Sequence, residues 1–170
     1  MDDRGFERAV IAHKDRVFAF ATAMLKDGAE AQDVSQESLI RLWQNRNAVE
    51  EDGTRPWLMR TAHNLCIDRL RKRKVRGEIA EGDTVVASQV DHTPGPQQAA
   101  ESSEIRANLQ SVLGELPAVD RAVLVMREIQ GLPYEEIAGV LGLPLGTLKA
   151  RLHRARDRLR SRLVRAGVTP

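Results

Sequence analysis

Apolar residues recur at intervals of three and four along most of the chain, and this spacing predicts a succession of amphipathic helices. Val10, Val17, Ala21 and Met24 would line one face of a first helix that ends near residues 26–28. A second helix is expected over 29–46 and a third over 54–74. After residue 100, one stripe covers 105–113, and a second follows Pro117 and runs to Gly131, with Val119, Ala122, Val123, Met126 and Ile129 as its members. Runs of alternating β-branched residues are lacking, so the pattern predicts an all-α chain.

Two helical patterns meet at residues 142–144, within the segment 132–165. Pro133 suits the first turn of the leading helix, where a missing N–H costs nothing. Gly142 can adopt the left-handed conformation that ends this helix, and Pro144 suits the start of the next. The second helix carries an apolar stripe of Leu145, Leu148, Leu152, Ala155, Leu159 and Leu163. A short helix, a glycine turn and a second helix predict a helix-turn-helix, a motif whose second helix enters the DNA major groove.

Charge strengthens that interpretation because it is concentrated in two places. The formal net charge is only +2, but of 26 basic residues six fall within 69–76 and eight within 149–165. Two cationic surfaces are typical of nucleic-acid binding. The alternative is a solvated basic helix in an ordinary helical bundle.

Other classes of site are disfavoured by composition. Cys66 is the single cysteine, which excludes an internal disulfide, and its place on an apolar helix face favours a buried side chain over a reactive thiol. The four histidines lack the spacing of zinc ligands, so no metal or other cofactor is expected. No apolar stretch approaches a membrane span or a signal-peptide core, which predicts a soluble, cytoplasmic protein.

Residues 77–100 differ from the helical segments on either side. They contain four acidic residues and no Lys or Arg, and they include the run from Pro94 to Pro96. This composition predicts a flexible acidic linker. The chain is therefore expected to form two small helical domains, over 1–76 and 101–170.

Polar side chains gather on the second predicted helix. Asp33, Gln36 and Glu37 lie on neighbouring turns and would form a compact acidic patch. Two carboxylates four residues apart could hold a metal for phosphate chemistry, but nothing else in the chain completes such a site. A protein-docking patch or a plain solvated face is favoured, and the chain is not expected to be an enzyme.

The third predicted helix combines an aromatic side chain with polar and basic ones. Trp57, Arg60 and Asn64 are spaced three and four apart, and the basic cluster follows one turn later. Base stacking, hydrogen bonding to a base edge and cations on the backbone together are typical of single-strand binding. The alternative is that Trp57 only packs in the core.

The motifs in their order resemble a bacterial extracytoplasmic-function (ECF) sigma factor of the sigma-70 family. The resemblance rests on D-V-S-Q-E, on R-P-W-L-M-R-T-A-H-N-L-C-I-D-R-L-R, on the acidic linker, and on L-P-Y-E-E-I-A-G-V-L-G-L-P-L-G-T-L-K-A-R-L-H-R-A-R. It extends from about Phe6 to Leu163. It implies a sigma-2 helical domain over 1–76, a linker, and a sigma-4 helix-turn-helix domain over 101–170.

The resemblance also implies partners and site residues. Binding of core RNA polymerase, at its clamp helices, would fall to Asp33, Gln36 and Glu37. Melting and reading of the −10 promoter element would fall to Trp57, Arg60, Asn64 and Arg71. Reading of the −35 element would fall to Thr147, Lys149, Ala150, Arg151, His153 and Arg154. Promoter DNA and core polymerase are thus the expected partners, together with a separate anti-sigma factor.

Two other classes of function stay open at this point. A stand-alone helix-turn-helix regulator would bind duplex DNA without polymerase. A nucleic-acid enzyme would use Asp33 and Glu37 with a metal.

Overall fold

The computed structural model describes residues 1–77 and 97–168, and within these ranges the chain is helical and contains no strand. The elements are α1 (Asp3–Leu25), α2 (Gly28–Gln44), α3 (Thr54–Val75), α4 (Gln97–Gly114), α5 (Ala118–Leu124), the π-helical turn η1 (Val125–Ile129), α6 (Tyr134–Leu141) and α7 (Leu145–Arg165). The predicted all-α class is confirmed.

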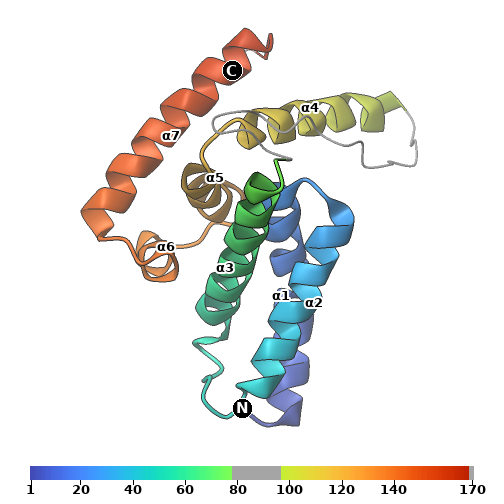
Figure 1. The fold of residues 1–170 in the computed structure, drawn as a ribbon, viewed down its shortest axis with the longest axis vertical. Helices are drawn as coiled ribbons and strands as arrows, with labels where there is room; N and C mark the ends of the chain where they lie inside the picture. The colour runs from blue at the N-terminus through green and yellow to red at the C-terminus, as the bar shows by residue number, and fades with distance from the viewer. Residues whose placement is uncertain (78–96, 169–170) are drawn as a thin grey trace.

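Helices α1, α2 and α3 form an antiparallel bundle (Figure 1). Asp2 and Asp27 each accept a hydrogen bond from the backbone N–H three residues later, which satisfies a donor that the first turn of a helix leaves unpaired. The predicted stripe on α1 is correct, since Val17, Ala21 and Met24 are fully buried against the other two helices. Burial of these faces is what orients the bundle, because isolated helices of this length gain little from propensity alone.

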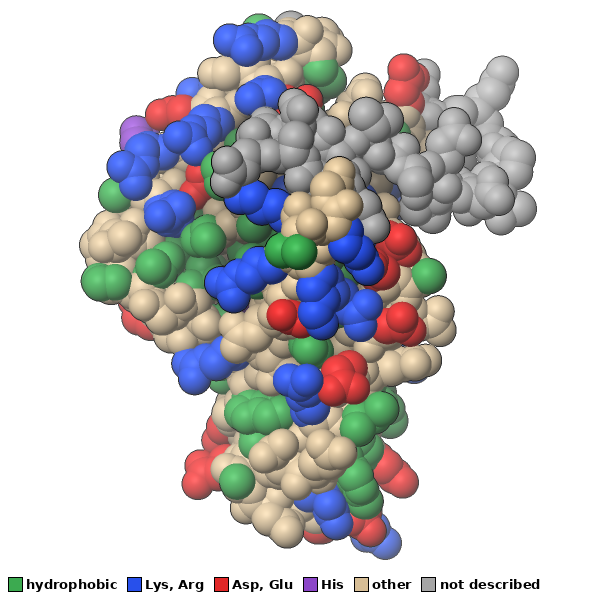
Figure 2. All heavy atoms as spheres, in the orientation of Figure 1, with side chains coloured by type: hydrophobic (Ala, Val, Ile, Leu, Met, Phe, Trp, Pro, Cys, Tyr) green, Lys and Arg blue, Asp and Glu red, His purple; other side chains and the backbone are tan. Residues whose placement is uncertain are grey.

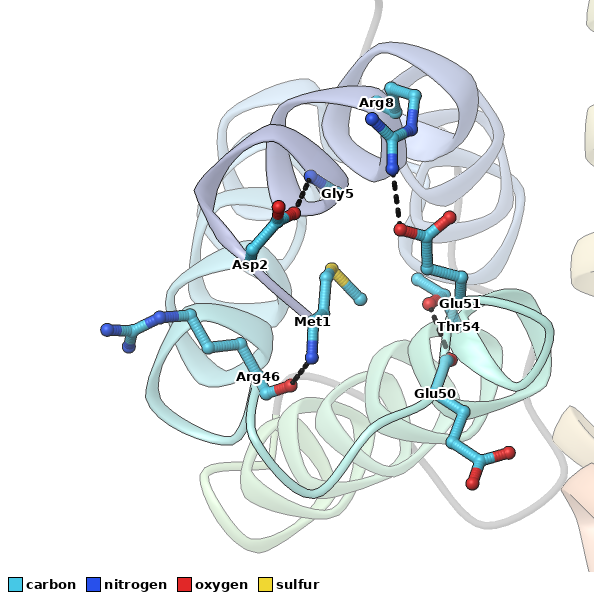
Figure 3. Close-up of polar contacts among 8 residues, drawn as sticks. All are labelled: Met1, Asp2, Gly5, Arg8, Arg46, Glu50, Glu51 and Thr54. Atoms are coloured by element: carbon cyan, nitrogen blue, oxygen red, sulfur yellow. Dashed lines mark hydrogen bonds and ion pairs between the residues drawn. The ribbon is translucent and has the colours of Figure 1, made fainter.

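The N-terminal end of the bundle is closed by polar contacts, which Figure 3 shows in close-up. The α-amino group of Met1 donates to the carbonyl of Arg46 at 2.8 Å, and Arg8 pairs with Glu51 at 2.6 Å. Gly5 lies under this loop, where an added Cβ would stand 2.6 Å from the Glu51 carboxylate. These contacts tie the start of α1 to the loop that leads into α3.

The helix-turn-helix is formed by α6 and α7. Gly142 ends α6 with a left-handed φ of 65°, as its sequence position predicted. Pro133 and Pro144 stand one residue before α6 and α7, so Pro133 precedes the first turn rather than lying within it. Leu148 and Leu152 of α7 are buried, as the predicted stripe requires.

The stripe predicted to run to Ile129 is wrong at its end. Gln130 donates its backbone N–H to the carbonyl of Val125, which is a five-residue π-type bond. The extra residue in this turn rotates the following side chains, and Ile129 is therefore 56% exposed while Met126 is buried.

Helix α4 begins at Gln97, so the last four residues of the predicted linker are helical. The remainder of that segment, 78–96, lies outside the described residues.

The two helical groups contact each other directly. Buried side chains from α1–α3 and from α5–α7 belong to one continuous apolar core. Helix α6 lies against α3, and α5 lies between the bundle and α7 (Figure 1). The face of α3 that carries the candidate nucleic-acid residues is therefore next to the helix-turn-helix.

Candidate functional site

A cleft of about 550 Å³ lies between α2 and α3 and contains the predicted acidic patch. Asp33 and Gln36 are exposed, and Glu37 is half-buried and accepts a hydrogen bond from Arg41 at 2.8 Å. The opposite wall of the cleft includes Asp68, Arg69 and Lys72 of α3 and Arg76, the residue that follows this helix. The structure thus brings the three predicted residues together on an open surface, opposite a wall that is mostly basic.

Metal chemistry finds no support at this cleft. Across residues 1–77 and 97–168, no group of three or more His, Cys, Asp or Glu side chains is arranged to hold a metal ion. The carboxylates of the cleft are better suited to recognising a cationic or polar protein surface.

On α3, the four residues predicted for single-strand binding share one side of the helix. Trp57 is half-buried and packs against the apolar core, so it has a structural role as well as an accessible edge. Asn64 and Arg71 are exposed. Arg60 is exposed too, but its guanidinium donates to the carbonyl of Gly139 in α6 at 2.5 Å. Of these four residues, Arg60 is therefore the one that the structure shows bound to the helix-turn-helix.

An ion pair reinforces the contact between α3 and α6. Arg55 binds both carboxylate oxygens of Glu136, at 2.8 and 2.5 Å, and the Glu136 side chain is only 15% exposed. This hydrogen bonding raises the pKa of the Arg55 guanidinium. Nearby, Arg16 and Gln130 exchange hydrogen bonds with each other's backbone carbonyls at 3.1 and 3.0 Å. The bidentate geometry strengthens and orients the pair, and removal of Arg55 would leave the largely buried Glu136 carboxylate without its charged partner.

The second helix of the motif, α7, exposes most of the residues predicted to read duplex DNA. Figure 2 shows Lys and Arg side chains gathered along this helix. The exposed members of the predicted set are Thr147, Lys149, Ala150, His153 and Arg154. They leave an outward surface with small and cationic side chains, which suits entry into a groove lined by phosphates.

Arg151 is the exception among the predicted residues. Its guanidinium turns toward α5 and donates to Asp120 at 2.9 Å, and its Nε is buried without a hydrogen-bond partner. Arg158, two turns further along α7, donates to the other oxygen of the same carboxylate, also at 2.9 Å. The Asp120 side chain is 5% exposed. Sequence reasoning missed this residue, although an acid between Val119 and Ala122 in an apolar stripe was a usable signal.

A second residue that was missed is Arg121, which is buried at the junction of the two helical groups. Its guanidinium donates to the carbonyl of Met24 at the end of α1, to those of Leu113 and Gly114 at the end of α4, and to that of Leu116 just after α4. Burial lowers the pKa of Arg121, and the neighbouring Arg73 lowers it further. These carbonyls belong to helix ends that have no partners within their own helices.

Cys66 lies in the apolar core, as predicted, and burial raises the pKa of its thiol to about 12. The described helices include none that is long and apolar enough to cross a bilayer.

Comparison with known families finds two matching models. The model described as Sigma-70 region 2 matches residues 9–76, and the model described as Sigma-70, region 4 matches residues 106–159. Both matched ranges coincide with the helical groups that carry the candidate surfaces.

Similar proteins match over nearly the whole chain. The ECF RNA polymerase sigma factor SigW of Bacillus subtilis is 35% identical over 169 residues, which cover 95% of this chain and 90% of that protein. The ECF RNA polymerase sigma factor SigE of Mycolicibacterium smegmatis is 35% identical over 161 residues, and the chain spans 62% of its length.

Among solved structures, CnrH in complex with the cytosolic domain of CnrY is similar, with a TM-score of 0.71 and 26% identity over 97% of this chain and 90% of that one. The sigma factor RpoE of Bartonella quintana, solved with the anti-sigma factor NepR, has the same fold, with a TM-score of 0.71 and 22% identity over 93% of this chain and 96% of that one.

Proposed function

Since this chain belongs to the ECF RNA polymerase sigma factors of the sigma-70 family, we propose that it binds core RNA polymerase and directs it to promoters through their −10 and −35 elements. The observation that carries this proposal is the presence, in one chain, of an open acidic cleft on α2, an aromatic and basic face on α3, and a cationic helix-turn-helix. A sigma factor needs one surface for the enzyme and two for DNA. The catalytic chemistry would belong to the polymerase.

The cleft between α2 and α3 is the surface that we assign to core polymerase. Asp33, Gln36 and Glu37 line it with exposed or half-exposed polar groups. Exposed carboxylates favour an encounter with a basic partner surface and fix its register.

We assign the −10 element to α3 and the −35 element to α7. Trp57, Arg60, Asn64 and Arg71 combine a stacking group, a hydrogen-bonding amide and cations, which is the set that an unpaired strand requires. On α7, the assigned side chains are Thr147, Lys149, Ala150, His153 and Arg154. Arg151 is assigned a different role below, because its charge is already paired.

An anti-sigma factor is a further partner that we propose. Support comes from RpoE and CnrH, the structural neighbours, which were solved with NepR and with the cytosolic domain of CnrY. A function alongside polymerase and promoter DNA also leads us to propose a cytoplasmic location.

The two competing functions account for less of the molecule. A stand-alone regulator would leave the acidic cleft and the α3 face without a use. A nucleic-acid enzyme would use Asp33 and Glu37 with a metal, and among the described residues these two do not belong to a group of three or more His, Cys, Asp or Glu arranged to hold one.

The deciding experiment is promoter-specific transcription by core polymerase with the added chain. Asp33→Lys combined with Glu37→Lys should abolish core binding and transcription while far-UV circular dichroism stays unchanged. The matched control is Glu7→Lys with Asp15→Lys, which makes the same charge change at exposed positions of α1. Wild-type core affinity in the Asp33/Glu37 variant would exclude the assigned surface. Specific duplex binding without polymerase would favour the regulator, and metal-dependent turnover would favour the enzyme.

A further inference from the structure

Asp120 is a buried carboxylate beneath the DNA-facing helix. It lies on α5, its side chain is 5% exposed, and its two oxygens each accept one hydrogen bond from an arginine of α7. Oδ1 receives Arg151 and Oδ2 receives Arg158, both at 2.9 Å. An ionised carboxylate is stable in such a place only with charged partners, and here both partners come from one helix.

The spacing of the two arginines determines what this contact fixes. Residues seven apart lie two turns apart on the same side of an α-helix, about 10 Å along its axis. A carboxylate that engages both from between them resists sliding of α7. It also resists rotation, because a shift of one residue turns the helix by about 100° and would carry both guanidinium groups away.

We propose that Asp120 is a positioning residue for −35 recognition, which fixes the rotation of α7 on α5 and withholds Arg151 and Arg158 from DNA phosphates. This inference rests on the proposed function of the helix-turn-helix. It means that the exposed side chains of α7, from Thr147 to Arg154, meet the groove in one set orientation. It also means that two of the eight basic residues within 149–165 are held by an acid of α5, although the Arg151 and Arg158 side chains are 33% and 55% exposed.

The contrast with a neighbouring pair supports this distinction. Arg156 also pairs with an acid, Glu128, at 2.6 Å, but both of those side chains are 44% exposed. Water and salt compete strongly for an exposed pair of this kind. The contrast lies in the two acids, since Asp120 is buried and Glu128 is exposed, while the arginines that they bind on α7 are all at least one-third exposed.

The test is Asp120→Asn, which keeps the size of the side chain and removes its charge. Holoenzyme binding is measured on a library of −35 variants and on one promoter at salt concentrations from 50 to 200 mM. Each freed arginine should steepen the slope of log affinity against log salt concentration by roughly 0.9. Per arginine, this is about a threefold greater loss of affinity between 50 and 200 mM salt. The preference for one base over another should fall at all −35 positions together, because α7 as a whole loses its fixed orientation. Glu128→Gln, the control, should change neither discrimination nor slope by a comparable amount.

Arg151→Gln separates positioning from direct contact, and it decides the matter if the Asp120 variant fails to fold. A withheld Arg151 predicts reduced discrimination with an unchanged salt slope. A slope reduced by about one would show that Arg151 binds a phosphate, and this would overturn the proposal. An Asp120→Asn protein that is folded and has wild-type discrimination and slope would overturn it as well. Failure of the wild-type holoenzyme to select any −35 sequence would instead refute the proposed function.

Discussion

Replacing Arg121 by Met should destabilise the whole protein. The guanidinium donates to four backbone carbonyls, and three of these hydrogen bonds are buried. A hydrogen bond to a charged group contributes about 1.5–3 kcal/mol, so the gross stabilisation is roughly 6–12 kcal/mol. Burying a guanidinium beside Arg73, with no carboxylate partner among the described residues, offsets several kcal/mol of that sum, as the lowered pKa indicates. The net loss in the free energy of unfolding should be about 3 kcal/mol.

Urea denaturation measures this loss directly. With a slope of about 2 kcal/mol per molar, the midpoint should fall by roughly 1.5 M. Arg121→Lys should recover less than half of the loss, because a single ammonium cannot reach carbonyls on two sides. Arg106→Met, at an exposed arginine of α4, is the matched control and should shift the midpoint by less than about 0.3 M.

Fluorescence adds a second readout, since both tryptophans, Trp43 and Trp57, lie in the first helical group. Arg121 binds the Met24 carbonyl of α1, so its loss should shift the fluorescence transition although the substitution lies in α5. A fluorescence transition that stays at its wild-type midpoint while circular dichroism shifts would refute the coupling of the two groups. A change in unfolding free energy below about 0.5 kcal/mol would refute the energetic reasoning altogether.

Three further outcomes are expected. Trp57→Ala and Asn64→Ala should reduce promoter melting more than they reduce initial duplex binding. Melting is measured by the permanganate reactivity of unpaired thymines, and equal effects on both steps would argue against a single-strand role. Arg154→Ala should cost about 1–3 kcal/mol of promoter-binding free energy and relax base preference at particular −35 positions. Arg160→Ala should weaken binding to all promoters alike. A uniform loss of binding for Arg154→Ala would contradict base reading. Burial lowers the pKa of His63 in the folded protein below its ordinary 6.5, so the unfolded chain binds a proton first as the pH falls. The free energy of unfolding should therefore decrease below pH 6.5, and urea midpoints measured between pH 7 and 5 should show this. His63→Leu should flatten this dependence of stability on pH.

Much of the fold could be predicted because its signals are local. The left-handed Gly142 marks the end of α6 from the sequence alone. The stripe through Val17 and Met24 identifies a buried face by spacing alone. The exposed Ile129 was mispredicted because a π-turn changes that spacing, and no residue type signals one in advance.

The internal arginines could not be predicted, because their partners are distant in sequence. Arg121 and Met24 are 97 positions apart, and the acceptor is a backbone carbonyl that any residue supplies. Arg151 and Asp120 are 31 positions apart, so the arginine was assigned to DNA with its neighbours on α7. A basic run predicts a cationic helix but does not say which of its charges are neutralised from within.

The contact between Arg60 and the Gly139 carbonyl limits where this chain can bind. The −10 and −35 elements are named for their positions along the DNA. These positions lie about 25 base pairs apart, which is roughly 85 Å of duplex at 3.4 Å per pair. In this structure Arg60, on the surface that we assign to the −10 element, donates at 2.5 Å to Gly139 of α6, the helix that precedes the one we assign to the −35 element. On these assignments, α3 and α6 would have to separate before one chain could contact both elements, so the compact arrangement would compete with promoter engagement.

The effect of this competition on affinity follows from the free energy that favours the compact form. If the contacts at α3 and α6 favour the compact form by about 2 kcal/mol, only about 3% of free molecules are extended, and the apparent affinity for polymerase falls roughly 30-fold. The concentration at which the protein begins to capture polymerase is then set partly by Arg55 and Glu136, two residues that touch neither enzyme nor promoter in the proposed assignment. Substitutions at that pair would tune the onset of transcription without altering which promoters are read.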